Sequence, residues 1–180
     1  MALILFDLNG TLLDPGSGQG TLQAAVRLAM AHTLADDFRP FAELLEAVGG
    51  EVPDEMAPFP DVPEGLDRLR NRRHRLAVLT NSARETGERH LQRAGLRDSF
   101  ERVIGVDEIG AYKPARRTYA FALEQLDVAA EHAWLVAAHD WDLIGAQAAG
   151  LRTAFLARGG PRPSTIVVDR EAADLTALEL

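Results

Sequence analysis

The stretch FDLNGTLLD, residues 6–14, ends an apolar run with a single carboxylate, Asp7. Ala2 to Phe6 has the pattern of a short buried strand, and Gly10 supplies a turn just beyond it. A carboxylate is ionised at neutral pH without a base to activate it, so Asp7 can act as a nucleophile. Taken alone, Asp7 would be a turn residue.

Lys113, in AYKPARRTY, is the only lysine among the 19 basic residues, and all the others are arginine. A compact ammonium and a planar guanidinium are not equivalent in a small charged pocket. We therefore expect Lys113 to hold Asp7 in place and to offset the repulsion between Asp7 and an anionic substrate.

The elements that must position these residues alternate between helix and strand after residue 60. The pattern predicts helices at 64–73, 83–94, 115–126 and 141–149 and strands at 76–80, 102–106, 133–137 and 153–156, with a weaker strand and helix at the end. Such alternation builds a doubly wound parallel sheet of the α/β class. Two helical patterns at 21–34 and 41–48 predict a small helical cap at 14–60, inserted into a core of 1–13 and 61–180.

In an open parallel sheet, the ligand crevice lies beyond the carboxyl ends of the strands. The predicted strand ends carry Asp7 and Asn9, then Thr80, Asn81 and Ser82, then residues 138–142. We expect these residues to converge with Lys113. Thr80, Asn81 and the free N–H groups at the start of the next helix should form an anion-binding corner.

These segments resemble the four signature motifs of the haloacid dehalogenase superfamily of hydrolases, in order and in context. The matching stretches are DLNGTLLD, LTNSA, YKP and AAHDWDLIGAQAAG. Two longer segments, YKPARRTY and VAAHDWDLIGAQAAGLRTAF, are most similar in sequence to the 2-haloacid dehalogenase branch. The resemblance implies a Rossmann-like core, a helical cap after the first strand, and an aspartyl intermediate on Asp7 that water cleaves. The insert is shorter than the cap of that branch.

The resemblance assigns roles to individual side chains. Asp7, Thr11, Lys113 and Asp142 would be catalytic, and substrate would contact Asn9, Thr80, Asn81, Ser82 and His139. We expect Asp142, at a helix start, to orient water for the second step. His139 would assist water activation or be a hydrogen-bonded structural histidine. Taken alone, Asn81 and Asp142 would be helix caps.

Two positions depart from the phosphatases of the superfamily. Asn9 stands where they carry a second aspartate that acts as general acid, and an amide cannot give up a proton in that way. Ala138 stands where they carry a magnesium-binding carboxylate. Displacement of halide from carbon needs neither a general acid nor a metal that neutralises a phosphate, so both departures favour dehalogenation. If magnesium binds, its ligands would be Asp7, Asn9 and Asp142, with Asp140 turned away as a cap or toward solvent.

Three further residues are candidates for the site. The dehalogenase branch has a cap arginine that binds the substrate carboxylate, and the candidates here are Arg27 and Arg39. Tyr119 would either reach back into the crevice or pack in the core with its hydroxyl tethered.

The composition excludes several classes of protein. A chain of 180 residues, 47% of them hydrophobic, suffices for one core. The absence of cysteine excludes disulfides, thiolate metal sites and thiol nucleophiles. A net charge of −8 argues against nucleic-acid binding. The lack of a membrane-length apolar run and of a signal peptide predicts a cytoplasmic protein with no membrane partner.

Together these patterns predict a hydrolase that acts on a small anionic organic acid through Asp7 and requires no cofactor. A homodimer is left open. Two alternatives remain: a magnesium-dependent phosphatase of a small phosphate ester, and a non-catalytic protein that keeps the sheet for binding.

Overall fold

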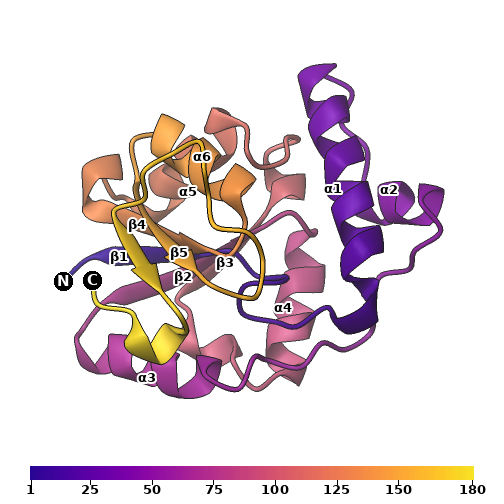
Figure 1. Cartoon of the computed structure of the whole chain (residues 1–180). Coiled ribbons are helices and arrows are strands. Elements are labelled where there is room, and N and C mark those ends of the chain that lie inside the picture. Colours follow the sequence, from indigo (N-terminus) through magenta and orange to yellow (C-terminus); the bar gives the residue numbers. More distant parts are fainter.

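Six parallel strands form one sheet in the computed structural model, which describes all 180 residues (Figure 1). The strand order is β3-β2-β1-β4-β5-β6, and every registered pair is parallel. The strands are β1 (Leu3–Phe6), β2 (Arg75–Thr80), β3 (Arg102–Gly105), β4 (Ala133–Ala137), β5 (Arg152–Leu156) and β6 (Arg170–Ala172). The predicted doubly wound parallel sheet is confirmed.

The chain forms six α-helices: α1 (Gln19–Leu34), α2 (Phe41–Ala47), α3 (Val62–Asn71), α4 (Arg84–Arg93), α5 (Arg116–Leu126) and α6 (Asp140–Ala148). Their bounds differ from the predicted ones by only a few residues. No helix combines the length and the apolar character needed to cross a lipid bilayer.

The central strand β1 is apolar throughout because both faces of the sheet are covered. Ile4 and Phe6 pack in a cluster with residues of α3 and α4, whereas Leu3 and Leu5 pack in a second cluster with residues of α5 and α6. Successive side chains of a strand point to opposite faces, so four consecutive apolar residues supply both cores.

Helices α1 and α2 stand together at one side of the molecule (Figure 1). They share an apolar cluster that includes Ala25 and Ala29 of α1 and Phe41 of α2, and that also takes in Val106 and Tyr112 from the sheet side. The helical pair lies within residues 14–60, as predicted for the cap. The division of the chain into core and cap stays a prediction.

Candidate active site

The strand order reverses direction at β1 and β4, and the candidate site lies at their carboxyl ends. From β1 the sheet continues through β2 and β3 on one side, and from β4 through β5 and β6 on the other. Such a reversal leaves a crevice for a ligand. A cavity of about 390 Å³ lies there, and its lining includes Asp7, Asn9, Thr80, Asn81, Ser82, Ala138 and His139. We call it the Asp7 cavity.

Asp7 is held by a hydrogen bond at each carboxylate oxygen. Its Oδ2 accepts from the Thr11 hydroxyl at 2.7 Å, and its Oδ1 accepts from Lys113 Nζ at 2.8 Å. The Thr11 oxygen in turn accepts from the backbone N–H of Ala138 at 3.0 Å, so its proton is directed toward Asp7. Thr11, the expected catalytic threonine, is fully buried and acts on the site by fixing the rotamer of Asp7.

The Lys113 ammonium has all three of its N–H groups engaged. It donates to Asp7 Oδ1 at 2.8 Å, to Asp142 Oδ2 at 2.6 Å and to the carbonyl of Leu79 at 2.9 Å. Its side chain is 0% exposed. A lysine has three donors in a compact head, and three acceptors around a buried point leave none of them unpaired. This arrangement explains why the chain keeps one lysine among its arginines.

The charges of this cluster shift the pKa values of its members. Burial alone would raise the pKa of Asp7, but the Lys113 ammonium and the hydrogen bonds outweigh it and lower the pKa. Burial would lower the pKa of Lys113, but Asp142 and Asp7 raise it. Asp7 is therefore an anion and Lys113 a cation at neutral pH. For Asp142, burial raises the pKa although Lys113 opposes that shift.

Asp142 lies behind Lys113 and outside the lining of the Asp7 cavity. It is 0% exposed, and its Oδ1 accepts from the Tyr119 hydroxyl at 2.5 Å while its Oδ2 is taken by Lys113. The expectation that Asp142 orients water meets a geometric obstacle, because both oxygens are occupied and neither faces the cavity. In this geometry Asp142 is a positioning residue that acts through Lys113.

Tyr119 contributes more to the site than the sequence indicated. Its hydroxyl also contacts the backbone carbonyl of Asp142 at 3.0 Å, and burial raises its pKa well above the usual value. It therefore stays a neutral donor. A tyrosine six residues after Lys113, one turn into α5, was the available signal.

His139 lies beside Asp7 rather than in the core. Its Nε2 donates to the Asn9 carbonyl at 3.2 Å and lies 3.8 Å from Asp7 Oδ2, and its ring stacks on Trp141 at 5.3 Å between centroids. Gly10 makes this approach possible: its φ is +80°, and a Cβ there would lie 2.8 Å from His139 Nε2.

The expected anion-binding corner has fewer free donors than predicted. The Ser82 N–H is taken by the Thr80 hydroxyl at 3.1 Å, and the Arg84 N–H by Asp107 Oδ1 at 2.8 Å. Asn81 holds the backbone of Lys113 in place, because its Oδ1 accepts a hydrogen bond from the Lys113 N–H at 2.9 Å. Two of the expected N–H donors are therefore occupied by protein side chains, and anion binding by Thr80, Asn81 and Ser82, which all line the cavity, stays a prediction.

The residues that would hold magnesium do not fit an ion. No group of three or more His, Asp or Glu side chains is arranged to bind a metal. The Asn9 carbonyl is occupied by His139, Asp142 does not face the cavity, and Ala138 offers no ligand. Asp140, the first residue of α6, is exposed as expected, accepts from the Trp141 N–H at 2.7 Å and lies at the lining of the Asp7 cavity.

Of the two candidate arginines, only Arg27 lines the Asp7 cavity. Arg27 of α1 lines the cavity and is exposed, whereas Arg39 lies outside the lining and pairs with Asp37 at 3.2 Å. Sequence reasoning missed Arg158, which follows β5 by two residues. Its guanidinium is engaged by Asp61 at 2.6 and 2.9 Å, and its Nε donates to the Thr11 carbonyl at 3.0 Å.

The chain is similar in sequence to known proteins. Residues 18–156 match the model of a family described as haloacid dehalogenase-like hydrolase. Over 105 residues the chain is 34% identical to an (S)-2-haloacid dehalogenase of Pseudomonas sp. (strain YL), which covers 58% of this chain and 45% of that protein. The chain spans about half the length of the haloacid dehalogenases it matches. It is 28% identical to a phosphoglycolate phosphatase of Aquifex aeolicus, over 86% of this chain and 84% of that protein.

Solved structures share the fold. The structure of L-2-haloacid dehalogenase from Xanthobacter autotrophicus with chloropropionic acid covalently bound matches with a TM-score of 0.85 and 23% identity, over 98% of this chain and 96% of that one. A structure described as a dehalogenase with intermediate complex gives a TM-score of 0.88 at 22% identity, over 98% and 94% of the two chains.

We expect Lys113→Met to lower the free energy of unfolding by about 3–5 kcal/mol at pH 7, because it leaves two buried carboxylates without their cation. The lowered pKa of Asp7 is a stabilising contribution of the folded wild type that is present above its unfolded pKa and lost in acid. In the variant, burial without the cation raises the pKa of both carboxyl groups, so they take up protons and the cost of burying their charge falls as pH falls from 7 toward 4. The difference between wild type and variant should therefore shrink over this range, before the wild-type contribution itself is lost below about pH 4.

Urea denaturation across this pH range checks the prediction. The control is Arg70→Met, which removes an exposed cation paired with Asp67 at 3.5 Å and should change stability by at most about 0.5 kcal/mol. A Lys113→Met protein as stable as the control at pH 7 would contradict a charged cluster.

Proposed function

The chain belongs to the haloacid dehalogenase-like hydrolase family, and from this premise we propose that it displaces halide from carbon 2 of a small 2-haloacid through a covalent ester on Asp7. The observation that carries the proposal is the state of Asp7. Its carboxylate is anionic, faces the cavity, and is aimed by Thr11 and Lys113, with neither a general acid nor a metal donor set beside it.

In the first step, an Asp7 carboxylate oxygen attacks carbon 2 of the substrate. The new C–O bond forms as the carbon–halogen bond breaks, and the halide leaves with the bonding electron pair. No proton moves, so Asn9 in place of an acid is no handicap. Lys113 keeps Asp7 in position and offsets its repulsion toward the anionic substrate.

In the second step, water attacks the Cγ carbon of the Asp7 ester. The bond between Cγ and the ester oxygen breaks, the product leaves as a 2-hydroxy acid, and Asp7 returns to a carboxylate with release of one proton. His139 is the group we assign to accept that proton, because it lines the cavity 3.8 Å from Asp7 Oδ2 whereas Asp142 does not face it. To do so, His139 must present the lone pair of Nε2, which requires the tautomer that carries its proton on Nδ1.

Arg27 is the group we assign to the substrate carboxylate. It lies on α1, lines the same cavity as Asp7, and has no acidic partner within salt-bridge distance. A guanidinium suits a carboxylate because its planar fork gives two parallel hydrogen bonds. Arg39, the other candidate, is already paired with Asp37.

A magnesium-dependent phosphatase is the second candidate function. It is favoured by the similarity to the phosphoglycolate phosphatase, 84% of which is matched by this chain, against 45% of the (S)-2-haloacid dehalogenase. Two observations oppose it. The residues near Asp7 offer no set of metal ligands, and the N–H groups of Ser82 and Arg84, which could bind a phosphate, are bonded to other side chains. Phosphate release from an aryl phosphate that requires magnesium would favour this candidate, and metal-independent halide release from 2-chloropropionate would favour the first.

Mass spectrometry of the protein mixed with 2-chloropropionate should detect an ester on the peptide that contains Asp7. Asp7→Asn should form no ester and release no halide. His139→Asn should accumulate the ester, because loss of a general base slows hydrolysis by about 100-fold or more. The control is His132→Asn, which changes an exposed histidine outside the Asp7 cavity and should behave as wild type. Halide release by Asp7→Asn would contradict a mechanism in which Asp7 is the nucleophile.

Arg27→Gln should raise KM for a 2-haloacid about tenfold with a smaller effect on kcat, since an exposed charged hydrogen bond to the substrate is lost. Arg39→Gln removes the same charge from the same part of the chain, outside the cavity, and is the matched control. Steady-state halide release by both variants checks the assignment. Equal effects of the two substitutions would show that the arginines act only through long-range charge.

A further inference from the structure

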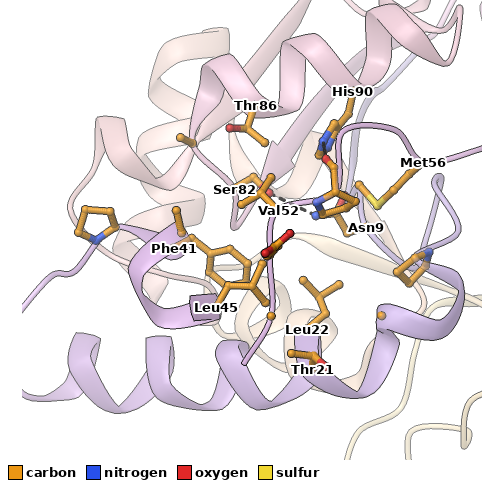
Figure 2. Close-up of a pocket in the computed structure, with 18 of the residues that line it drawn as sticks. Asn9, Thr21, Leu22, Phe41, Leu45, Val52, Met56, Ser82, Thr86 and His90 are labelled. Carbon is orange, nitrogen blue, oxygen red and sulfur yellow. Dashed lines mark hydrogen bonds between the residues drawn. The ribbon is translucent and has the colours of Figure 1, made fainter. Parts of the chain in front are cut away.

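A second cavity adjoins the Asp7 cavity, between the α1–α2 pair and α4 (Figure 2). Its volume is about 430 Å³. The two cavities share five lining residues: Asn9, Pro15, Leu22, Phe41 and Ser82. We call the second cavity the side chamber. Asn9 and Ser82, which are joined by a hydrogen bond from Asn9 Nδ2 to Ser82 Oγ at 3.2 Å, lie where the two cavities meet.

The walls of the side chamber are largely apolar. In Figure 2, Leu22, Phe41 and Leu45 approach it from the helical pair, and Val52 and Met56 from the segment that follows α2. Pockets of this size lined by apolar and aromatic side chains take apolar portions of small ligands. Shape and polarity therefore point to a hydrocarbon occupant.

The charges around the side chamber exclude a second anion. Its lining contains the carboxylates of Glu51 and Asp107 but no lysine and no arginine. His90 also lines it, but its Nε2 donates to the Pro53 carbonyl at 2.8 Å and burial lowers its pKa, so the imidazole is neutral at pH 7. The cation available for a substrate carboxylate is Arg27, on the Asp7 side.

We propose that the preferred substrate is a monocarboxylic acid with a neutral apolar chain, whose chain beyond carbon 2 occupies the side chamber. The proposal rests on the function proposed above and deepens it. The carboxylate lies toward Arg27, carbon 2 faces Asp7, and the chain passes between Asn9–Ser82 and Leu22–Phe41. Short haloacids would bind without filling the side chamber.

Calorimetry with unreactive carboxylates tests this binding mode without relying on turnover. Affinity should rise from propanoate to hexanoate to octanoate by about fourfold for each methylene that is buried. With 2-bromo derivatives of the same acids, kcat/KM should rise with chain length in parallel.

Two substitutions fill the side chamber from different walls. Thr86→Phe adds a ring from α4, and Val52→Phe adds one from the segment after α2. Each should lower the octanoate-to-propanoate affinity ratio about tenfold or more while 2-bromopropanoate turnover stays near wild type. The matched control is Gln92→Phe, which adds the same ring on an exposed position of α4 outside both cavities.

The outcomes separate this proposal from the function on which it rests. The side-chamber proposal is supported if affinity rises with chain length in the wild type and this gain falls in both filled variants. It is supported even if no bromoacid reacts, and such a lack of reaction would overturn only the dehalogenase proposal. Turnover of 2-bromopropanoate with no gain in affinity or kcat/KM for longer chains would overturn the side-chamber proposal and leave the dehalogenase intact. A gain that persists in both filled variants would also overturn it.

Discussion

The buried ammonium of Lys113 between the carboxylates of Asp7 and Asp142 is the interaction on which the site depends. Removing three charges from water is costly, and the cost is offset only when the geometry pairs each charge well. Here the acceptors come from three neighbouring strands: Leu79 on β2, Asp7 after β1, and Asp142 after β4. The strand order that defines the fold therefore also assembles the charge cluster, and the cluster ties together the carboxyl ends of the central strands.

This cluster determines which chemistry the site suits. Asp7 is kept anionic by a fixed cation, so it needs neither a base to activate it nor a metal to orient it. The same arrangement supplies no proton for a leaving group, because Asn9 is an amide and Tyr119 is committed to Asp142. A leaving group that departs as a stable anion meets these conditions, and halide is such a group. In the function proposed above, the positive charge for the substrate carboxylate is assigned to Arg27 of α1, which lines the same cavity.

Sequence reasoning succeeded where a general rule of parallel sheets applied. The carboxyl ends of adjacent parallel strands share one edge, so Asp7, Thr80 and residues 138–142 had to meet there once the strands were recognised. It was less successful for the direction of individual side chains. Asp142 was expected to face water and is enclosed behind Lys113, while the N–H groups of Ser82 and Arg84 were expected to be free and are bonded to Thr80 and Asp107.

By itself, the sequence determined which reactive groups are present and in what order they occur. It has one lysine, no cysteine, an amide at position 9, an alanine at position 138, and polar residues that follow apolar strands. Those properties are local, because residue types and the hydrophobic period of a strand or helix can be recognised within a short window of sequence. Only the tertiary structure decided that Arg27 rather than Arg39 lines the Asp7 cavity, that Arg158 supports Thr11, and that a side chamber opens beyond Asn9. These features depend on how α1 and α2 pack beside α4, and contacts between segments so far apart in the chain leave no pattern in any single stretch of sequence.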